Sequence, residues 1–335
     1  MMHDELMIWD GESRAIDRVP ESLERWRGLF PPWRTPASKD ISRRKTETPE
    51  PNEQDVSRGS TWRGEGEDLV ERVNMALWLR RPILVEGEPG IGKSSLAYSL
   101  AWSLGLGRVL RWEISSRTTL QDGLYHYDAV SHLRQSQMTQ ESDSHSVADF
   151  ITLGALGTAL VGSDSSKPRV LLIDEIDKSD YDLPNDLLHV LEEASFGIPE
   201  LKRSSVDSDE PLEVQGFDEE AKEGRIGLKG GRVVSGVHPI VVMTSNAERE
   251  FPDAFRRRCV PLRLERPRGR KLEKLVQLHF DKSEVELKKK VRSMLLYPDS
   301  SLEGRPDQVL QGLFMRTQGM SEEQVRKILR EDSGD

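Results

Sequence analysis

Apolar residues in the middle of the chain alternate between short continuous runs and helical spacing. Continuous runs predict buried strands at residues 82–85, 169–173 and 239–243, and residues 109–114 are a further strand candidate. Apolar residues at intervals of three and four predict helices between these runs, over residues 67–77, 94–104 and 183–194. Strands that alternate with helices are typical of an α/β domain built on a mainly parallel sheet.

The two ends of the chain differ from this middle part. Residues 1–60 contain many prolines and charges and few aliphatic residues, so we expect an irregular arm that ends in a polar linker, residues 37–59. Residues 61–267 form the predicted core domain. Helical apolar spacing returns afterwards, so residues 268–335 are expected to form a small helical domain.

Some features depart from this regular pattern. Trp9, Trp26 and Trp33 in the arm are expected to cover the chain's own core, with packing on a neighbouring molecule as the alternative. Polar segments near residues 117–160 and 203–236 interrupt the core domain and are interpreted as surface insertions. Because the second segment lacks apolar periodicity, we expect the chain to fold without it.

Composition and charge exclude some classes of protein and indicate the cellular compartment. The 335 residues carry 48 Lys and Arg against 58 Asp and Glu, a formal net charge of −10, which argues against a protein that mainly coats nucleic acid. Cys259 is the single cysteine, so no intramolecular disulfide can form, which fits a reducing compartment. No apolar run has the length of a signal peptide in residues 1–10, or the roughly 18 residues of a membrane helix elsewhere. We therefore expect a cytoplasmic protein that does not span a membrane.

A phosphate-binding loop follows the first predicted strand. Its sequence, Gly-Glu-Pro-Gly-Ile-Gly-Lys-Ser, matches the pattern G-x-x-x-x-G-K-[ST] and opens a helix, which is the context that this pattern requires. In such a loop backbone N–H groups surround the phosphates, Lys93 reaches the β- and γ-phosphates, and the Ser94 hydroxyl binds Mg²⁺. The residues expected to bind nucleotide here are Gly87, Glu88, Pro89, Gly90, Ile91, Gly92, Lys93, Ser94 and Ser95.

Two carboxylates end the third predicted strand. Asp174 is expected at the tip of the strand, where it would bind nucleotide together with Ser94 by helping to hold Mg²⁺. Glu175 is expected to polarise the attacking water. Their position after the phosphate loop and an intervening strand makes this pair a much stronger signal than an isolated Asp-Glu. Asp177, two residues further on, is interpreted as a surface or helix-capping charge.

With these motifs the chain resembles the AAA+ ATPases, and within them the MoxR-like branch, over roughly residues 67–319. Two further segments carry the resemblance: residues 242–246, Val-Met-Thr-Ser-Asn, and residues 251–259, Phe-Pro-Asp-Ala-Phe-Arg-Arg-Arg-Cys. The resemblance implies a P-loop NTPase fold of the AAA+ type, in which helices flank a parallel sheet and the C-terminal helical domain, residues 268–335, serves as a lid.

The resemblance also implies roles for individual residues. Asn246 lies where the family has its first sensor, a polar side chain that orients water against the γ-phosphate. Arg258 lies where the family has the arginine finger that completes the neighbouring subunit's site, and Arg257 is the close alternative. A solvated basic cluster is the other interpretation of both. Arg305, which precedes a proline, is the candidate for the second sensor and so for nucleotide contact.

Together, the residues and the resemblance predict an ATPase that uses ATP and Mg²⁺ and works as a self-associated ring, with a hexamer as the expected size. The resemblance implies a chaperone-like remodelling role on a partner protein, such as one with a von Willebrand A domain. An NTP-driven motor of a nucleic-acid restriction or defence system and a slow nucleotide-gated scaffold stay open as alternatives. Residues 123–128 resemble part of the MoxR-like insertion, and their aromatic side chains either face a ring pore or, as we expect, join the core.

Overall fold

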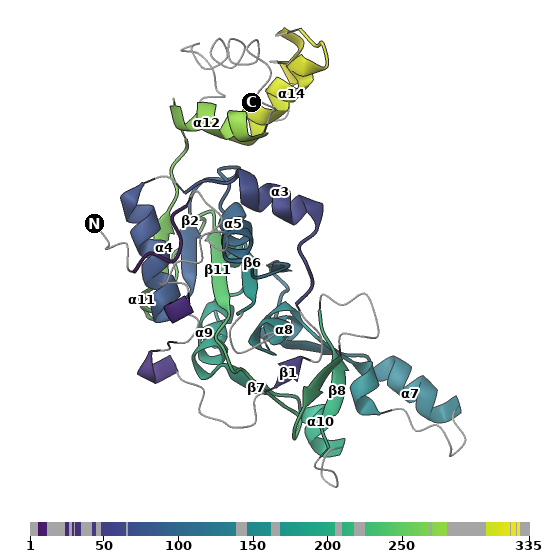
Figure 1. Cartoon of the computed structure of the whole chain (residues 1–335). Coiled ribbons are helices and arrows are strands. Elements are labelled where there is room, and N and C mark those ends of the chain that lie inside the picture. The colour runs from purple at the N-terminus through teal and green to yellow at the C-terminus, as the bar shows by residue number, and fades with distance from the viewer. Residues whose placement is uncertain are drawn as a thin grey trace.

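The structure, a computed structural model, describes residues 6–11, 24–26, 29, 31–34, 42–44, 48–64, 66–138, 146–161, 168–204, 210–217, 225–267, 270–279, 306–321, 323–325 and 327–328. Figure 1 shows a central sheet with helices packed against it, smaller strands at one end and two helices, α12 and α14, at the other. Within these ranges, every helix is too short or too polar to cross a lipid bilayer.

The central sheet has five parallel strands, one more than the sequence predicts. Its order is β12–β2–β11–β6–β3, and each neighbouring pair is parallel. The strands are β2 (Ile83–Glu86), β3 (Leu110–Glu113), β6 (Val170–Asp174), β11 (Ile240–Ser245) and β12 (Val260–Arg263). Their carboxyl ends therefore meet at one edge of the sheet, where α/β proteins bind their ligands.

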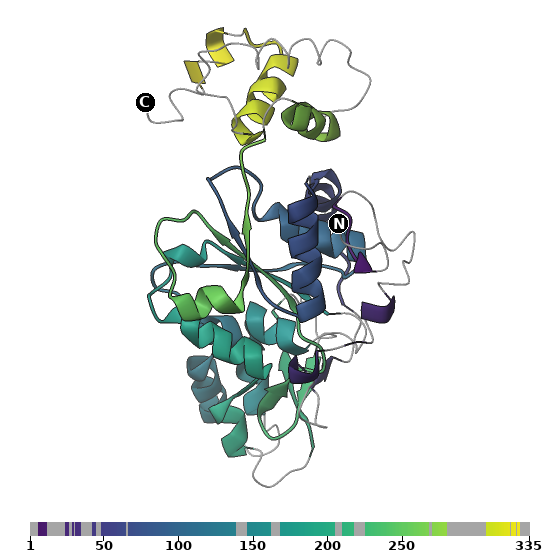
Figure 2. The ribbon, with the colours of Figure 1, turned by 90° about the vertical axis from the view of Figure 1, so that its left-hand side faces the viewer.

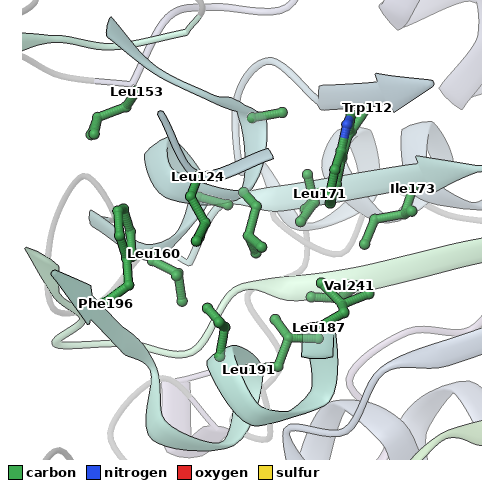
Figure 3. Close-up of a cluster of buried hydrophobic side chains, with 14 of the residues drawn as sticks. Trp112, Leu124, Leu153, Leu160, Leu171, Ile173, Leu187, Leu191, Phe196 and Val241 are labelled. Atoms are coloured by element: carbon green, nitrogen blue, oxygen red, sulfur yellow. The ribbon is translucent and has the colours of Figure 1, made fainter. Parts of the chain in front are cut away.

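β2, β6 and β11 read as nearly continuous apolar runs because both faces of the sheet are covered, whereas the edge strands β3 and β12 alternate buried and exposed residues. Along β6, Leu171 and Ile173 enter one buried cluster, whereas Val170 and Leu172 enter another. Figure 3 shows part of the first cluster, and Figure 2 shows the helices on the two sides of the sheet. The first cluster includes helices α8 (Ala155–Val161), α9 (Leu183–Glu193) and α11 (Asp253–Arg258). The second includes α4 (Glu67–Leu79) and α5 (Ser95–Leu104).

The two predicted insertions join in a second sheet, at the end of the molecule opposite α12 and α14 (Figure 1). Its order is β1–β9–β8–β5–β4, with strands β1 (Arg43–Arg44), β4 (Tyr125–Tyr127), β5 (Ile151–Leu153), β8 (Leu212–Gln215) and β9 (Arg225–Leu228). A separate pair consists of β7 (Ser195–Gly197) and β10 (Arg232–Val234). The helices of these segments are α6 (Leu120–Leu124), α7 (Ala129–Met138), α10 (Pro199–Ser204) and the 3₁₀ helix η3 (Val147–Phe150).

The interpretation of residues 203–236 as a surface insertion is wrong, because part of this segment belongs to the core. Val214, Ile226, Leu228 and Val233 from this segment are fully buried in the first cluster. Their strands are only three or four residues long, too short for an alternating pattern to stand out in the sequence. Tyr125, from the other insertion, is also buried in that cluster and Tyr127 packs against it, as expected for core residues, whereas His126 between them is exposed.

The N-terminal arm packs on α4 through two of its tryptophans. Trp9 and Trp26 are buried, as expected for an arm that covers the chain's own core, whereas Trp33 is 73% exposed. Asn74 on α4 accepts hydrogen bonds from the backbone N–H groups of Ile8 and Trp9, at 2.7 and 3.0 Å, and donates one to the Trp9 carbonyl at 2.7 Å. This amide therefore satisfies the arm's backbone as a neighbouring strand would.

The segment interpreted as a polar linker contains regular structure. Helix α3 (Glu53–Thr61) lies along α5, and a Cβ built at Gly59 would fall 2.5 Å from the Tyr98 carbonyl oxygen. Ser42 lies next to β1. Its backbone N–H donates to the Val234 carbonyl, and its hydroxyl accepts from the Val234 N–H and donates to the Arg232 carbonyl. These contacts use backbone atoms, one hydroxyl and a glycine, so apolar composition could not reveal them. The arm also contains the short 3₁₀ helix η2 (Pro32–Arg34).

The C-terminal helical region is present, as the sequence predicts. Helices α12 (Arg270–His279) and α14 (Pro306–Thr317) bury a small cluster of their own, made of Leu272, Val276, Val309 and Leu313. Arg305, the candidate second sensor, lies outside the described residues. The predicted domain boundaries at residues 60 and 267 stay predictions.

Candidate active site

The phosphate loop connects β2 to α5 at the carboxyl edge of the central sheet. All nine residues expected to bind nucleotide, 87–95, lie between the end of β2 and the first residue of α5. Gly90 and Gly92 have φ values of 77° and 87°, a left-handed conformation that favours glycine. Other segments approach them closely: a Cβ at Gly90 would lie 2.7 Å from an Asp307 carboxylate oxygen, and one at Gly92 would lie 3.2 Å from Trp62 Nε1. The loop is thus bordered by Trp62, at the end of α3, and by the C-terminal helices.

Lys93 uses all three of its ammonium hydrogens within the site. Its Nζ donates to the carbonyls of Gly87 and Glu88, each at 2.8 Å, and to Asn246 Oδ1 at 2.7 Å. Burial lowers the pKa of the Lys93 ammonium, and three nearby carboxylates, those of Asp177, Asp174 and Glu175, oppose this effect. The phosphate loop and the predicted first sensor are therefore joined by one cation.

Asp174 accepts hydrogen bonds from two neighbouring hydroxyls. Ser94 Oγ and Thr244 Oγ1 both donate to Asp174 Oδ1, at 2.8 and 2.6 Å. The guanidinium of Arg111 contacts the other oxygen, Oδ2, at 3.0 Å. The structure thus brings together Ser94 and Asp174, the two residues that the sequence predicts as Mg²⁺ ligands.

Glu175 is held in an unusual backbone conformation. Its φ of 61° and ψ of 48° lie in the left-handed region, which costs a residue with a Cβ about 1–3 kcal/mol. Its backbone N–H donates to Thr244 Oγ1 at 2.9 Å, so Thr244 joins the backbone of Glu175 to the carboxylate of Asp174. The Glu175 side chain pairs with Lys178 at 2.6 Å, and both side chains are half exposed.

Asp177 is not the surface charge that the sequence suggested. It is buried, and its Oδ2 accepts hydrogen bonds from the backbone N–H groups of Asn246, at 2.8 Å, and Glu248, at 3.3 Å. It therefore fixes the loop that carries Asn246, next to Lys93. A carboxylate that satisfies backbone groups in a buried loop leaves no periodic signal in a sequence.

The two candidate fingers lie at the end of α11, away from this cluster. Arg258 Nε pairs with Glu192 Oε1 of α9 at 2.5 Å, so its guanidinium forms an ion pair within its own chain. Arg257 is exposed, and its carbonyl accepts a hydrogen bond from Arg81. Arg81 also donates to the carbonyls of Arg258 and Cys259, at 3.1 and 2.9 Å, and so holds the end of this helix.

Comparison with known proteins gives the family. A profile of the AAA domain, dynein-related subfamily, matches residues 82–259, more than half of the chain. The chain belongs to the AAA domain family. The matched residues of this AAA protein run from the strand before the phosphate loop to the end of α11.

Solved structures of RuvB from Thermotoga maritima also resemble this AAA protein. A RuvB variant is 16% identical, with 77% of this chain and 71% of that chain covered and a TM-score of 0.33. A structure described as the RuvB Holliday junction branch migration motor is 15% identical, with 72% and 63% covered and a TM-score of 0.29. A search of curated proteins gives no match.

Membership in the family supports nucleotide binding and hydrolysis by this AAA protein. A divalent metal usually accompanies the nucleotide in such proteins. The residues present fit Mg²⁺, because the hydroxyl of Ser94 and the carboxylate of Asp174 are hard oxygen donors that already lie 2.8 Å apart.

Sequence reasoning missed several residues of this cluster. It assigned no role to Thr244, Arg111 or Lys178, although each contacts Asp174 or Glu175. A weak signal exists for Thr244, which is a hydroxyl residue at the end of an apolar strand, two positions before Asn246. No sequence signal indicated a role for Arg111, since an exposed arginine in a short strand is common.

Proposed function

We propose that this AAA protein binds and hydrolyses ATP, as a ring-forming member of the MoxR-like type that remodels a partner protein. One observation carries the enzymatic part of the proposal: Lys93, Asp174, Glu175 and Asn246 meet at the carboxyl edge of one sheet, joined by direct hydrogen bonds and by Thr244. Groups of these types, in this arrangement, can bind phosphates and activate a water.

Nucleotide binding would begin by redirecting Lys93. Its ammonium group gives up the carbonyls of Gly87 and Glu88 in favour of the β- and γ-phosphates. Ser94 and Asp174 would hold Mg²⁺, which supplies charge neutralisation at the phosphate oxygens. The Ser94 hydroxyl can offer a lone pair to a metal while it still donates its hydrogen bond to Asp174 Oδ1.

Glu175 is the proposed general base for the attacking water. It accepts the water's proton on a carboxylate oxygen as the water attacks the γ-phosphorus, the bond from that phosphorus to the β,γ-bridging oxygen breaks, and ADP leaves with the electron pair. Lys178 pairs with Oε2 of this carboxylate, so Oε1 is the oxygen proposed to accept the proton. Asn246 orients the same water, and its position next to Lys93 supports that role.

Arg258 is the proposed finger for the neighbouring subunit, with Arg257 as the alternative. A guanidinium is always charged and forms two-pronged contacts with phosphate oxygens. In this proposal, assembly of the ring moves Arg258 from Glu192 of its own chain to the nucleotide of the next subunit. Arg257, which is exposed, would need no such release.

The ring size and the client come from the resemblance alone. We propose a hexamer, a cytoplasmic location in keeping with the single cysteine, and a partner that carries a von Willebrand A domain. Arg305 remains the proposed second sensor on the lid formed by residues 268–335.

A mixing experiment tests the shared site. Arg258→Ala and Lys93→Ala are each expected to be nearly inactive alone, whereas mixed rings contain some interfaces with an intact loop and an intact finger. ATPase activity should therefore partly return on mixing, and specific activity should rise with protein concentration. If mixing restores nothing while Arg257→Ala is inactive, Arg257 is the finger. If neither arginine matters and activity is independent of concentration, the shared site is refuted.

A second variant tests the chemistry within one subunit. Glu175→Gln should bind ATP and hydrolyse it at a small fraction of the normal rate, because the amide keeps the shape of the side chain and cannot accept the proton. Native mass measured with and without ATP then reports whether this trapped state assembles. Normal turnover by this variant would remove Glu175 from the mechanism.

A further inference from the structure

Arg111 places a positive charge on the carboxylate expected to help hold the metal. It lies on β3, the strand that pairs with β6 on the outer edge of the central sheet. Its guanidinium Nη2 is 3.0 Å from Asp174 Oδ2 and 2.9 Å from Glu113 Oε1. One guanidinium is thus shared between two carboxylates, one in the site and one beside it.

The hydrogen bonds of Asp174 show why this contact matters. Oδ1 is taken by the hydroxyls of Ser94 and Thr244, so Oδ2 is the oxygen that remains for a cation. The Asp174 side chain is only 11% exposed, against 42% for Arg111 and 71% for Glu113. A carboxylate this buried is costly without a positive partner, and Arg111 is its direct ion-pair partner among the described residues.

Other carboxylates near the phosphate loop make a positive partner for Asp174 more important. Asp174, Asp177 and Glu175 all raise the pKa of Lys93, which shows that three carboxylates lie within electrostatic reach of the phosphate loop. Lys93 itself donates to Gly87, Glu88 and Asn246 rather than to Asp174. Arg111 therefore balances Asp174 as long as no metal is bound.

We propose that Arg111 is a positioning residue that stands in for the metal cation at Asp174, and that it withdraws to Glu113 when Mg²⁺ and nucleotide bind. This inference rests on the proposed function, since it assumes a metal–nucleotide complex at this site. Glu113 is the second partner that makes withdrawal possible, because Arg111 keeps an ion pair there after releasing Asp174. Arg111 thus competes with Mg²⁺, and Glu113 weakens that competition.

The two residues are expected to act in opposite directions on the Mg²⁺ requirement. Arg111→Gln removes the competitor, so the Mg²⁺ concentration for half-maximal nucleotide binding should fall. For a partly exposed ion pair, we expect a change of about twofold to fivefold. Glu113→Gln leaves Arg111 with Asp174 alone, so the same concentration should rise. Arg111→Lys, which keeps the charge, should stay close to the unchanged protein.

The test titrates MgCl₂ against fluorescently labelled ADP bound to the full chain. Arg117→Gln is the matched control, because it removes the same charge from an exposed residue beyond the end of β3. Unfolding temperatures, measured in a chelator and again with saturating MgCl₂ and ADP, give a second readout. Arg111→Gln should lose stability in the chelator and regain it with the metal and nucleotide, since Mg²⁺ then balances Asp174.

The outcomes separate this inference from the proposed function. If the unchanged protein binds labelled ADP without any dependence on Mg²⁺, the metal-dependent site itself is refuted. If that dependence is present but Arg111→Gln leaves it unchanged or raises the Mg²⁺ requirement, Arg111 is not a competitor and the inference is overturned. A loss of stability in Arg111→Gln that metal and nucleotide do not reverse would likewise overturn it. If Arg111→Gln does not fold, Glu113→Gln still tests the inference, because it should raise the Mg²⁺ concentration for half-maximal binding. No rise in that variant would then overturn the inference.

Discussion

Replacing Thr244 by valine removes one hydroxyl and keeps the shape of the side chain. That hydroxyl donates to Asp174 Oδ1 at 2.6 Å and accepts the backbone N–H of Glu175 at 2.9 Å. Thr244 is 1% exposed, so water cannot take its place. The variant therefore leaves the N–H of Glu175 without its partner and removes one of two hydrogen bonds from Asp174 Oδ1.

The free-energy cost of each of these two lost hydrogen bonds can be estimated. A buried donor left without a partner costs about 1–3 kcal/mol, and a lost hydrogen bond to a charged group costs about 1.5–3 kcal/mol. Since the freed groups relax in part, we expect Thr244→Val to lower the free energy of unfolding by about 2–5 kcal/mol. The left-handed backbone of Glu175, with φ of 61°, also loses the contact that holds it, so the carboxylate should move away from its position for catalysis. A displacement of about 1 Å can reduce turnover about a hundredfold.

Three measurements on Thr244→Val check this reasoning. Urea unfolding gives the stability, binding of labelled ADP gives the affinity, and phosphate release from ATP gives turnover. Turnover should fall far more than affinity, because Lys93 and the phosphate loop do not depend on Thr244. Thr244→Ser, which keeps the hydroxyl, should retain most of the activity. Normal turnover and stability in Thr244→Val would show that this hydroxyl does not position Glu175.

The remaining predictions concern the loop, the second sheet and the cysteine. Lys93→Ala should abolish tight binding of labelled ADP, and unchanged affinity would refute the phosphate-loop assignment. Ile226→Ala should lower the free energy of unfolding in urea by about 2–5 kcal/mol and Ile226→Val by about 0.5–1.5 kcal/mol, because the side chain is fully buried; equal, negligible effects would mean that the second sheet does not pack. Burial raises the pKa of the Cys259 thiol to about 12, so its alkylation at mildly alkaline pH should be slow in the folded protein and fast in urea; equal rates would contradict its burial.

The central sheet could be predicted because its strands are covered on both faces. Three of its five strands, including the one that ends in Asp174, are apolar runs between clear turn signals, and the phosphate loop has a fixed spacing. β3 and β12, at the two edges of the sheet, both alternate buried and exposed residues, and β12 was missed because Pro261 within it weakens the strand signal. Burial on both faces gives a strong sequence signal, and burial on one face of a short strand gives a weak one.

The contacts within the site could not be predicted to the same degree. Lys93, Asp174 and Glu175 belong to motifs whose order along the chain is informative. The partners of these residues come from places that no motif connects: Arg111 from the neighbouring strand, Thr244 from β11, and Asp177 from a buried turn that was interpreted as surface. Such pairings depend on which strands become neighbours, which a single sequence does not state.

The second sheet has a consequence for the order in which the chain folds. Ser42, beside edge strand β1, bonds to Arg232, 190 residues further along the chain, so this contact closes a very long loop. Closing a loop of that length costs roughly 4–5 kcal/mol of chain entropy before any contact compensates for it. Contacts between distant segments also form slowly. The N-terminal arm therefore cannot complete its docking until residues beyond Val234 have emerged from the ribosome, and β1 should be among the last strands to join the native structure.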